Sequence, residues 1–220
     1  MKQIKGTASI LIAGMLLLSS CIGVQADISL RPDGSGTLVL EYRFSRMAEA
    51  LGKLDGNERW PLIPVGKADF ERTQERIPGL RLVSFSTQED KTDQYYRVKL
   101  EFADPDVLVR FLDATGQGAS LVQEPGKYRL TLTFTEGIDS VDPDLLALLD
   151  AVSAGYVLTV NLSFPAEGFL RVYDRDGGSL DALPGMRMVP QGKQVSFTAP
   201  LGAVLQYNRG LYMEIRWQPR

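Results

Sequence analysis

The sequence predicts an α+β fold in which a mostly antiparallel sheet carries short amphipathic helices packed on one face. Five segments alternate apolar and polar residues with a period of two, which is typical of strands with one buried and one solvated face. Short segments with apolar residues at helical spacing lie between them. Turns rich in Gly, Pro and Asp separate the segments. Runs of strands with helices between them are typical of α+β proteins.

Residues 1–20 predict a bacterial signal peptide, which we exclude from the fold. Lys2 and Lys5 form a basic head, and residues 7–18 are an uncharged apolar run. A membrane-spanning helix needs about 20 apolar residues, so this run is too short to span a bilayer. Small residues follow it and lead into Cys21, the only cysteine of the chain.

The sequence LSSC at residues 18–21 resembles the lipobox of bacterial lipoproteins. The resemblance implies that Cys21 becomes the first mature residue and carries a diacylglyceryl group and a further acyl chain. Each buried methylene contributes about 0.8 kcal/mol, so several chains anchor a protein firmly. We expect residues 21–27 to be a lipidated tether. The alternative is a plain signal peptide with an incidental cysteine.

The lipidation hypothesis also predicts the location of the chain. We expect it on the cell membrane or the outer membrane, with its domain facing the periplasm or the cell exterior. Ile22 stands where an aspartate would retain an enterobacterial lipoprotein in the inner membrane, and this favours an outer leaflet in a cell with two membranes.

The mature chain is mildly acidic and has no second cysteine for a disulfide. Removing Lys2 and Lys5 leaves 22 basic and 27 acidic residues, a net charge of −5. This balance argues against nucleic acid as a partner and against electrostatic docking on anionic lipid. About 200 residues suffice for a core without disulfides. We therefore expect residues 28–220 to form one α+β domain, with a subdivision near residue 165 left open.

The chain from residue 28 begins with a hairpin, in which the sequence RPDGSGT forms the turn. Strict alternation predicts strands at residues 38–44, 96–102, 128–134, 158–164 and 211–217. Weaker patterns predict strands at residues 80–87, 169–173 and 194–198. We expect the polar positions of three of the strands to form one solvated sheet face: Arg97, Lys99, Glu101, Arg129, Thr131, Thr133, Thr159, Asn161 and Ser163.

Helical spacing predicts helices at residues 47–54, 67–76, 108–112 and 145–152. Two of them follow the sequence DPD, in which the first aspartate can accept a hydrogen bond from a free helix N–H and proline suits the first helical position. We interpret all four aspartates of the two DPD sequences, Asp104, Asp106, Asp142 and Asp144, as capping residues before any catalytic role. The strand and helix of residues 96–114 resemble those of residues 128–151, and either duplication or convergent capping would produce this similarity.

The sequence predicts no catalytic residue, metal site or cofactor. It contains no histidine, which removes the usual general base and a common metal ligand. No pair of carboxylates stands out by spacing for glycosidase-like catalysis. The sequence YDRDGGSLD partly imitates an EF-hand loop, but glycines occupy the third ligand position, Gly178, and the twelfth, Gly185. We interpret it as a turn, and we expect that the chain is not an enzyme.

The loop DGNERWPLIPVGK differs from its surroundings because it is apolar and interrupted by prolines. Its Trp60 could simply plug the edge of the core. The alternative hypothesis is that Trp60, Leu62 and Ile63 form a lip over a ligand groove or a membrane-facing loop. In that case these three side chains are candidate ligand-binding residues.

The order of lipobox, short tether, strand, DGSG turn at residues 33–36 and strand is similar to that of small bacterial envelope lipoproteins with an LppM-like domain. Residues 211–217 supply a comparable closing strand. The resemblance implies an exported, lipid-anchored α+β domain in contact with lipids or glycolipids, and it supplies no catalytic residue.

We therefore expect a non-catalytic binding module, held on the membrane by Cys21, for a lipid, glycolipid or other envelope component. The alternative is a protein-interaction or structural component of an envelope assembly. An apolar cavity of several hundred Å3 would favour the first, and a filled core with an exposed apolar patch the second.

Overall fold

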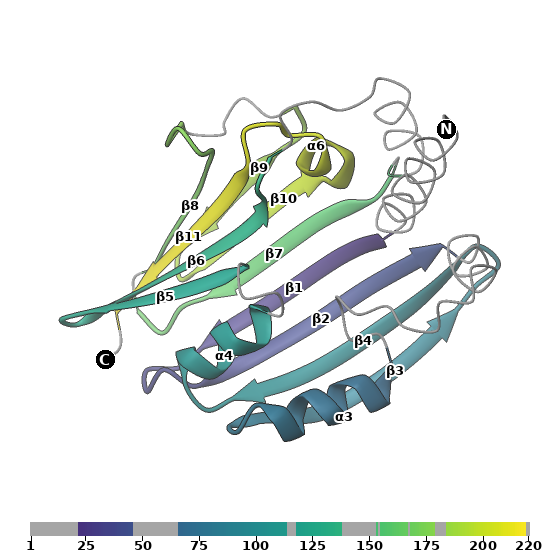
Figure 1. The fold of residues 1–220 in the computed structure, drawn as a ribbon, viewed down its shortest axis with the longest axis horizontal. Helices are drawn as coiled ribbons and strands as arrows, with labels where there is room; N and C mark the ends of the chain where they lie inside the picture. The colour runs from purple at the N-terminus through teal and green to yellow at the C-terminus, as the bar shows by residue number, and fades with distance from the viewer. Residues whose placement is uncertain are drawn as a thin grey trace, which may run out of the picture.

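The computed structural model describes residues 22–45, 66–113, 118–137, 153, 155–166, 168–178 and 184–218. Two sheets and three short helices make up this part of the chain, and the predicted α+β class is confirmed (Figure 1). The strands are β1 (Ile22–Leu30), β2 (Gly36–Ser45), β3 (Leu80–Glu89), β4 (Asp93–Phe102), β5 (Ala119–Glu124), β6 (Lys127–Thr135), β7 (Val157–Ser163), β8 (Gly168–Tyr173), β9 (Arg187–Gln191), β10 (Gln194–Pro200) and β11 (Leu211–Trp217). The helices are α3 (Lys67–Arg76), α4 (Pro105–Leu112) and α6 (Leu201–Leu205).

The larger sheet has seven strands in the order β3-β4-β2-β1-β7-β10-β9. Its neighbouring strands are antiparallel except for β1 and β7, which run parallel. The smaller sheet has four antiparallel strands in the order β5-β6-β11-β8. Strands after residue 165 therefore contribute to both sheets.

The N-terminal hairpin forms as predicted, but β1 begins at Ile22, six residues earlier than the alternation from residue 28 suggested. Residues 22–27 are thus part of a strand and not of an extended tether. The hairpin turn is closed by Asp33, whose Oδ1 accepts hydrogen bonds from the backbone N–H and the hydroxyl of Ser35 at 3.0 and 2.7 Å. Gly34 has φ +85°, a conformation that side chains disfavour.

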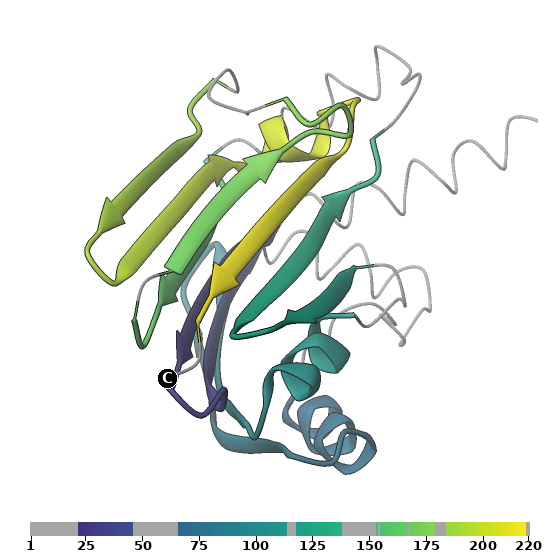
Figure 2. The same cartoon turned by 90° about the vertical axis from the view of Figure 1, so that its left-hand side faces the viewer.

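The smaller sheet and the helices α3 and α4 lie on the same face of the seven-stranded sheet (Figure 2). Phe134 of β6 stacks on Phe197 of β10 with ring centroids 6.2 Å apart, which places the smaller sheet over β7 and β10. Phe70 of α3 stacks on Tyr42 of β2 at 6.5 Å and on Phe111 of α4 at 6.5 Å. Helices α3 and α4 therefore cover the other half of the same face. The apolar side chains of both halves belong to one core.

Two of the three described helices, α3 and α4, were predicted from the sequence. Asp104 caps α4, since its Oδ1 accepts a hydrogen bond from the Val107 N–H at 2.8 Å, and Pro105 occupies the first helical position. The predicted helix at residues 67–76 is α3. The predicted helices at residues 47–54 and 145–152 lie outside the described residues. Among the described residues, no helix has both the length and the apolar character to cross a bilayer.

The predicted single polar sheet face is wrong, because its residues belong to two sheets. Arg129, Thr131 and Thr133 lie on β6 of the smaller sheet, whereas the others lie on β4 and β7 of the larger sheet. Alternation within a strand shows which residues share a face of that strand. It carries no information on which strands are neighbours.

Candidate functional site

The seven-stranded sheet presents mostly polar side chains on the face opposite the core, with Val39 and Val157 among them. Because facing residues in paired strands point the same way, the register assigns each of them to this face. We call this surface the polar face. Its polar residues on β1, β2, β4, β7 and β10 include Gln25, Asp27, Ser29, Thr37, Glu41, Arg43, Arg97, Lys99, Glu101, Thr159, Asn161, Ser163, Gln194, Ser196 and Thr198.

A chain of hydrogen-bonded side chains crosses three strands at the centre of the polar face. The hydroxyl of Ser196 donates to Oδ1 of Asn161 at 2.7 Å, and Nδ2 of Asn161 donates to Oδ1 of Asp27 at 2.7 Å. Gln25 donates from Nε2 to both carboxylate oxygens of Asp27, at 3.1 and 3.2 Å. Each of these side chains is fixed by its neighbours before any ligand arrives.

This chain borders the first of two hollows on the polar face. Its cavity volume is about 460 Å3, and Asp27, Asn161 and Ser196 line it together with Gln191 and Gln194 at the sheet edge. The lining is dominated by amide and hydroxyl groups, with one carboxylate. Such groups can donate and accept hydrogen bonds but offer little apolar surface.

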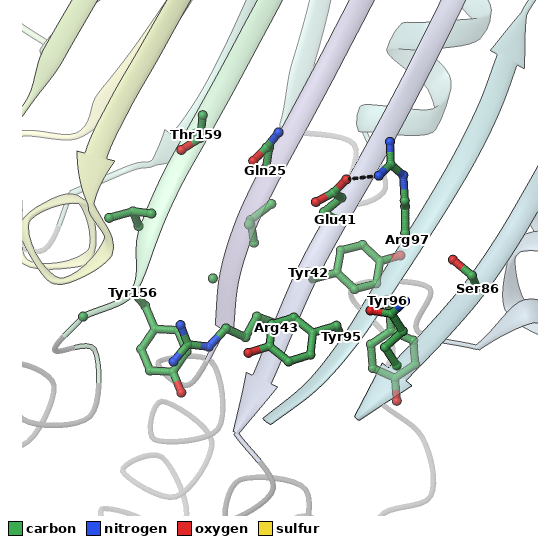
Figure 3. Close-up of a pocket in the computed structure, with 15 residues that line it drawn as sticks. Gln25, Glu41, Tyr42, Arg43, Ser86, Tyr95, Tyr96, Arg97, Tyr156 and Thr159 are labelled. Carbon is green, nitrogen blue, oxygen red and sulfur yellow. Dashed lines mark ion pairs between the residues drawn. The ribbon is translucent and has the colours of Figure 1, made fainter. Parts of the chain in front are cut away.

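The second hollow, of about 350 Å3, lies where β1 begins and β2 ends (Figure 3). Arg43 reaches across from β2, and its guanidinium lies 4.6 Å from the ring centroid of Tyr156, a cation–π arrangement. Its Nε also donates to Oδ2 of Asp93 at 3.0 Å. Its polar lining also includes Gln25, Thr159 and Tyr95, and the ion pair of Glu41 with Arg97 at 3.0 Å.

Asp93 is the buried centre of this second site. Only 5% of its side chain is exposed, whereas 41% of the Arg43 side chain is exposed. Besides Arg43, it accepts hydrogen bonds from the hydroxyls of Tyr156 at 3.1 Å and Thr92 at 3.2 Å. Burial and the hydrogen bond to this carboxylate raise the pKa of the Tyr156 hydroxyl. Asp93 thereby fixes the two side chains that shape the hollow.

The loop between β3 and β4 holds Tyr95 at the rim of the same hollow. Asp90 accepts hydrogen bonds from the backbone N–H groups of Asp93 and Thr92, each at 2.8 Å, and from the Tyr95 hydroxyl at 3.0 Å. These hydrogen bonds, those from the backbone first, lower the pKa of Asp90 to about 2. The Tyr95 ring is 37% exposed and offers an aromatic surface at the mouth of the hollow.

Both hollows are open depressions on a sheet surface, and neither is an enclosed cavity. The surface of the first is more polar than apolar, whereas that of the second, which includes Tyr95, Tyr156 and Val157, is mainly apolar. They suit a ligand with many hydroxyl, amide or phosphate oxygens, and the tyrosine rings add a flat surface on which a sugar or a similar ring can lie. Within the described ranges, no three His, Cys, Asp or Glu side chains gather as a metal site would require.

The sequence-predicted site residues Cys21, Trp60, Leu62 and Ile63 lie outside the described residues. The structure instead brings together Asn161, which the sequence analysis placed on a polar sheet face, with Asp27 and Ser196, which it did not single out. Asp27 and Asn161, for example, are 134 residues apart along the chain, and no sequence signal connects them. The alternation of residues 22–30 could have revealed Asp27 as a strand residue.

The sequence YDRDGGSLD starts with a turn, as predicted. Asp174 Oδ1 accepts hydrogen bonds from the backbone N–H groups of Gly178 at 2.8 Å and Asp176 at 3.1 Å. Its other oxygen accepts a hydrogen bond from Tyr207 at 3.2 Å. The carboxylate is therefore committed to holding the turn and the segment before β11 together.

The chain was compared with protein families, curated proteins and solved structures. No protein-family description matches this sequence, and no curated protein matches it. Among solved structures, the chain is similar to the NMR structure of the folded domain of LppM from Mycobacterium tuberculosis, with 14% sequence identity and a TM-score of 0.43 over 90% of this chain and 91% of that chain. The strand order and register of this chain are described from its own structure.

Proposed function

We propose that this chain is a bacterial lipoprotein, anchored through acylated Cys21, that binds a polar envelope component on its polar face without catalysis. The ligand is the glycan or headgroup part of a lipid, a glycolipid or a related envelope molecule. The observation that carries this proposal is the hydrogen-bonded chain from Ser196 through Asn161 and Asp27 to Gln25, beside a hollow of about 460 Å3.

The arrangement of this chain supports binding because its groups are already ordered. Ordering a side chain on binding costs about 0.5–1.5 kcal/mol, and a side chain held by its neighbours avoids most of that cost. Asn161 and Asp27 are both partly exposed, so each can bond to a ligand while keeping its protein partner. The polar lining favours the headgroup or glycan over the acyl chain as the bound part.

Binding can be tested by native mass spectrometry on residues 21–220 with Cys21→Ser, exposed separately to an envelope lipid fraction and to soluble envelope glycans. We expect a co-purifying mass that is lost in Asn161→Ala and retained in Asn208→Ala, an exposed asparagine in the turn before β11. Retention of the mass in both variants would exclude the hollow at Asn161 as the binding site. A mass from neither fraction would contradict the proposed function.

Anchoring is tested separately in cells. Cys21→Ala should leave an uncleaved precursor that takes up no radiolabelled palmitate. Labelling equal to that of the unmodified chain would rule out acylation at this residue.

A protein partner is the second candidate function, and it rests on the outer face of the smaller sheet. There, one row across the four strands reads Val122, Arg129, Arg216 and Phe169. Val122 and Phe169 are 45% and 49% exposed. Exposed apolar and arginine side chains in one row are typical of protein interfaces. A photo-crosslinker at position 169 should capture such a partner in intact cells. If no crosslinked protein forms, this second candidate function is excluded.

A further inference from the structure

The strand directions place one set of residues at the same end of the seven-stranded sheet. β1, β4 and β7 start at this end, whereas β2, β3 and β10 finish there. Gly23 faces Arg43, and Arg43 faces Tyr95, in adjacent strands. Tyr156 immediately precedes β7, and Val157 is its first residue. We call this end of the sheet the anchor rim, and the second hollow opens beside it (Figure 3).

The anchor rim is also where the lipid would be attached. β1 starts at Ile22, directly after Cys21 in the sequence, and consecutive Cα atoms are about 3.8 Å apart. No flexible spacer therefore separates the acylated residue from the sheet. Strand β1 has nine residues. At roughly 3.3 Å per residue, the opposite end of the sheet therefore lies about 27 Å from the anchor rim.

The side chains at the two ends of the polar face differ in kind. At the anchor rim, Tyr95 and Val157 are 37% and 46% exposed, and Arg43 lies over the ring of Tyr156. Tyrosine is enriched at membrane–water interfaces, and arginine can extend its charge toward the headgroups. The polar face at the opposite end instead carries short hydroxyls and amides, Ser29, Ser163, Gln191 and Gln194, and the ion pair of Glu101 with Arg81, without an exposed aromatic ring among them.

The charges at the rim are compatible with a neutral membrane surface. Arg43 forms an ion pair with Asp93, so the pair adds no net charge. The neighbouring turn between β3 and β4 carries Glu89, Asp90 and Lys91, so these five groups together sum to −1. A zwitterionic bilayer therefore suffices as a partner, and the acidic mature chain does not need to approach an anionic one.

From these observations we propose that the anchor rim lies on the leaflet that holds the acyl chains of Cys21, with Tyr95, Tyr156 and Val157 in the headgroup layer. The second hollow then opens at headgroup depth, while the hollow at Asn161 faces away from the membrane. This inference rests on the proposed lipidation and adds the orientation of the domain, which lipidation alone leaves free.

The test uses the full lipidated chain reconstituted in phosphatidylcholine vesicles, with a single environment-sensitive fluorophore. The acylated Cys21 is the only native cysteine, so Val157→Cys or Gln194→Cys supplies one reactive thiol. Both positions are exposed. Val157 pairs with Pro200 and Gln194 with Ser163, six residues further along β7, a separation of about 20 Å. Since the headgroup layer is only about 5–7 Å thick on each side, the two probes cannot both lie in it when the strands stand away from the membrane.

We expect a lipid with a spin label on its headgroup to quench the probe at position 157 at least about twofold more than the probe at position 194. Equal quenching, or stronger quenching at position 194, in protein that floats with the vesicles would overturn the proposed orientation while leaving the anchor intact. Protein that does not float with the vesicles would overturn the anchor, and the orientation with it.

Discussion

Replacing Asp93 with alanine should destabilise the fold, because this buried carboxylate connects three parts of the chain. It accepts hydrogen bonds from Nε of Arg43 at 3.0 Å, the Tyr156 hydroxyl at 3.1 Å and the Thr92 hydroxyl at 3.2 Å. Arg43 is on β2, Thr92 directly precedes β4 and Tyr156 precedes β7. Loss of the carboxylate therefore loosens one whole end of the seven-stranded sheet.

The size of the effect follows from the exposure of the partners. A hydrogen bond contributes about 1 kcal/mol net, and one to a charged group about 1.5–3 kcal/mol. The partners of Asp93 are partly exposed and can bond to water after the substitution, and removal of the carboxylate also relieves its own desolvation. We therefore expect a loss of about 2–3 kcal/mol in the free energy of unfolding. With an m-value of about 2 kcal/mol/M, the urea midpoint falls by about 1–1.5 M.

The assay is urea unfolding followed by circular dichroism, with Glu101→Gln as the matched control. Glu101 is on the same strand and forms an ion pair with Arg81, but 65% of the Arg81 side chain is exposed. Exposed pairs contribute about 0.2–1 kcal/mol, so this midpoint should move by at most about 0.5 M. An Asp93→Ala midpoint no lower than that of the control would refute the reasoning.

Three further results are expected. Asp90, whose pKa is lowered to about 2, should titrate near that value when its carboxyl group is followed by NMR. Its contribution to stability is complete above its ordinary pKa of 3.8 and is lost as the pH falls toward 2. A titration midpoint near 3.8 would show that the loop hydrogen bonds are absent. Phe197→Ala should cost about 3–5 kcal/mol in urea unfolding, because the ring is fully buried against Phe134 between the sheets, and a loss below about 1 kcal/mol would contradict that contact. Gly36→Ala should cost more than about 2 kcal/mol, since the new Cβ would collide with the Phe102 ring and a backbone carbonyl, and thermal unfolding at an unchanged temperature would disprove this crowding.

The strands were largely predictable from the sequence because their alternation is strong. All eight predicted strands are present, including the weak ones, which correspond to β3, β8 and β10. The start of β1 was missed although Val24, Ala26 and Ile28 alternate with Gly23 and Gln25, because the stretch was interpreted as a tether.

Two strands and a helix escaped prediction for local reasons. β5 and β9 are edge strands, and most of their side chains are exposed, so a buried face leaves little trace in their sequences. Pro190 in β9 also argues against a strand, although an edge can accept a residue that lacks an N–H donor. α6 is five residues long and contains Gly202, so it has little helical periodicity.

The candidate site was not predictable, since it depends on strand order. Asp27, Asn161 and Ser196 come together only because β1 pairs in parallel with β7 and β7 pairs with β10. Each residue alone looks like a solvated strand position. Their alignment across three strands is a property of topology, which local patterns do not encode.

The parallel pairing of β1 with β7 has a consequence for how the chain folds. The strands β1 to β4 can pair early, but the second edge of β1 stays open until residues 157–163 arrive. Asp27 and Asn161 are 134 residues apart, and contacts between residues so distant in sequence form slowly. An unpaired edge is a template for pairing with other chains. The newly made protein therefore passes through an aggregation-prone stage, and any factor that shields the β1 edge during this interval would increase its yield.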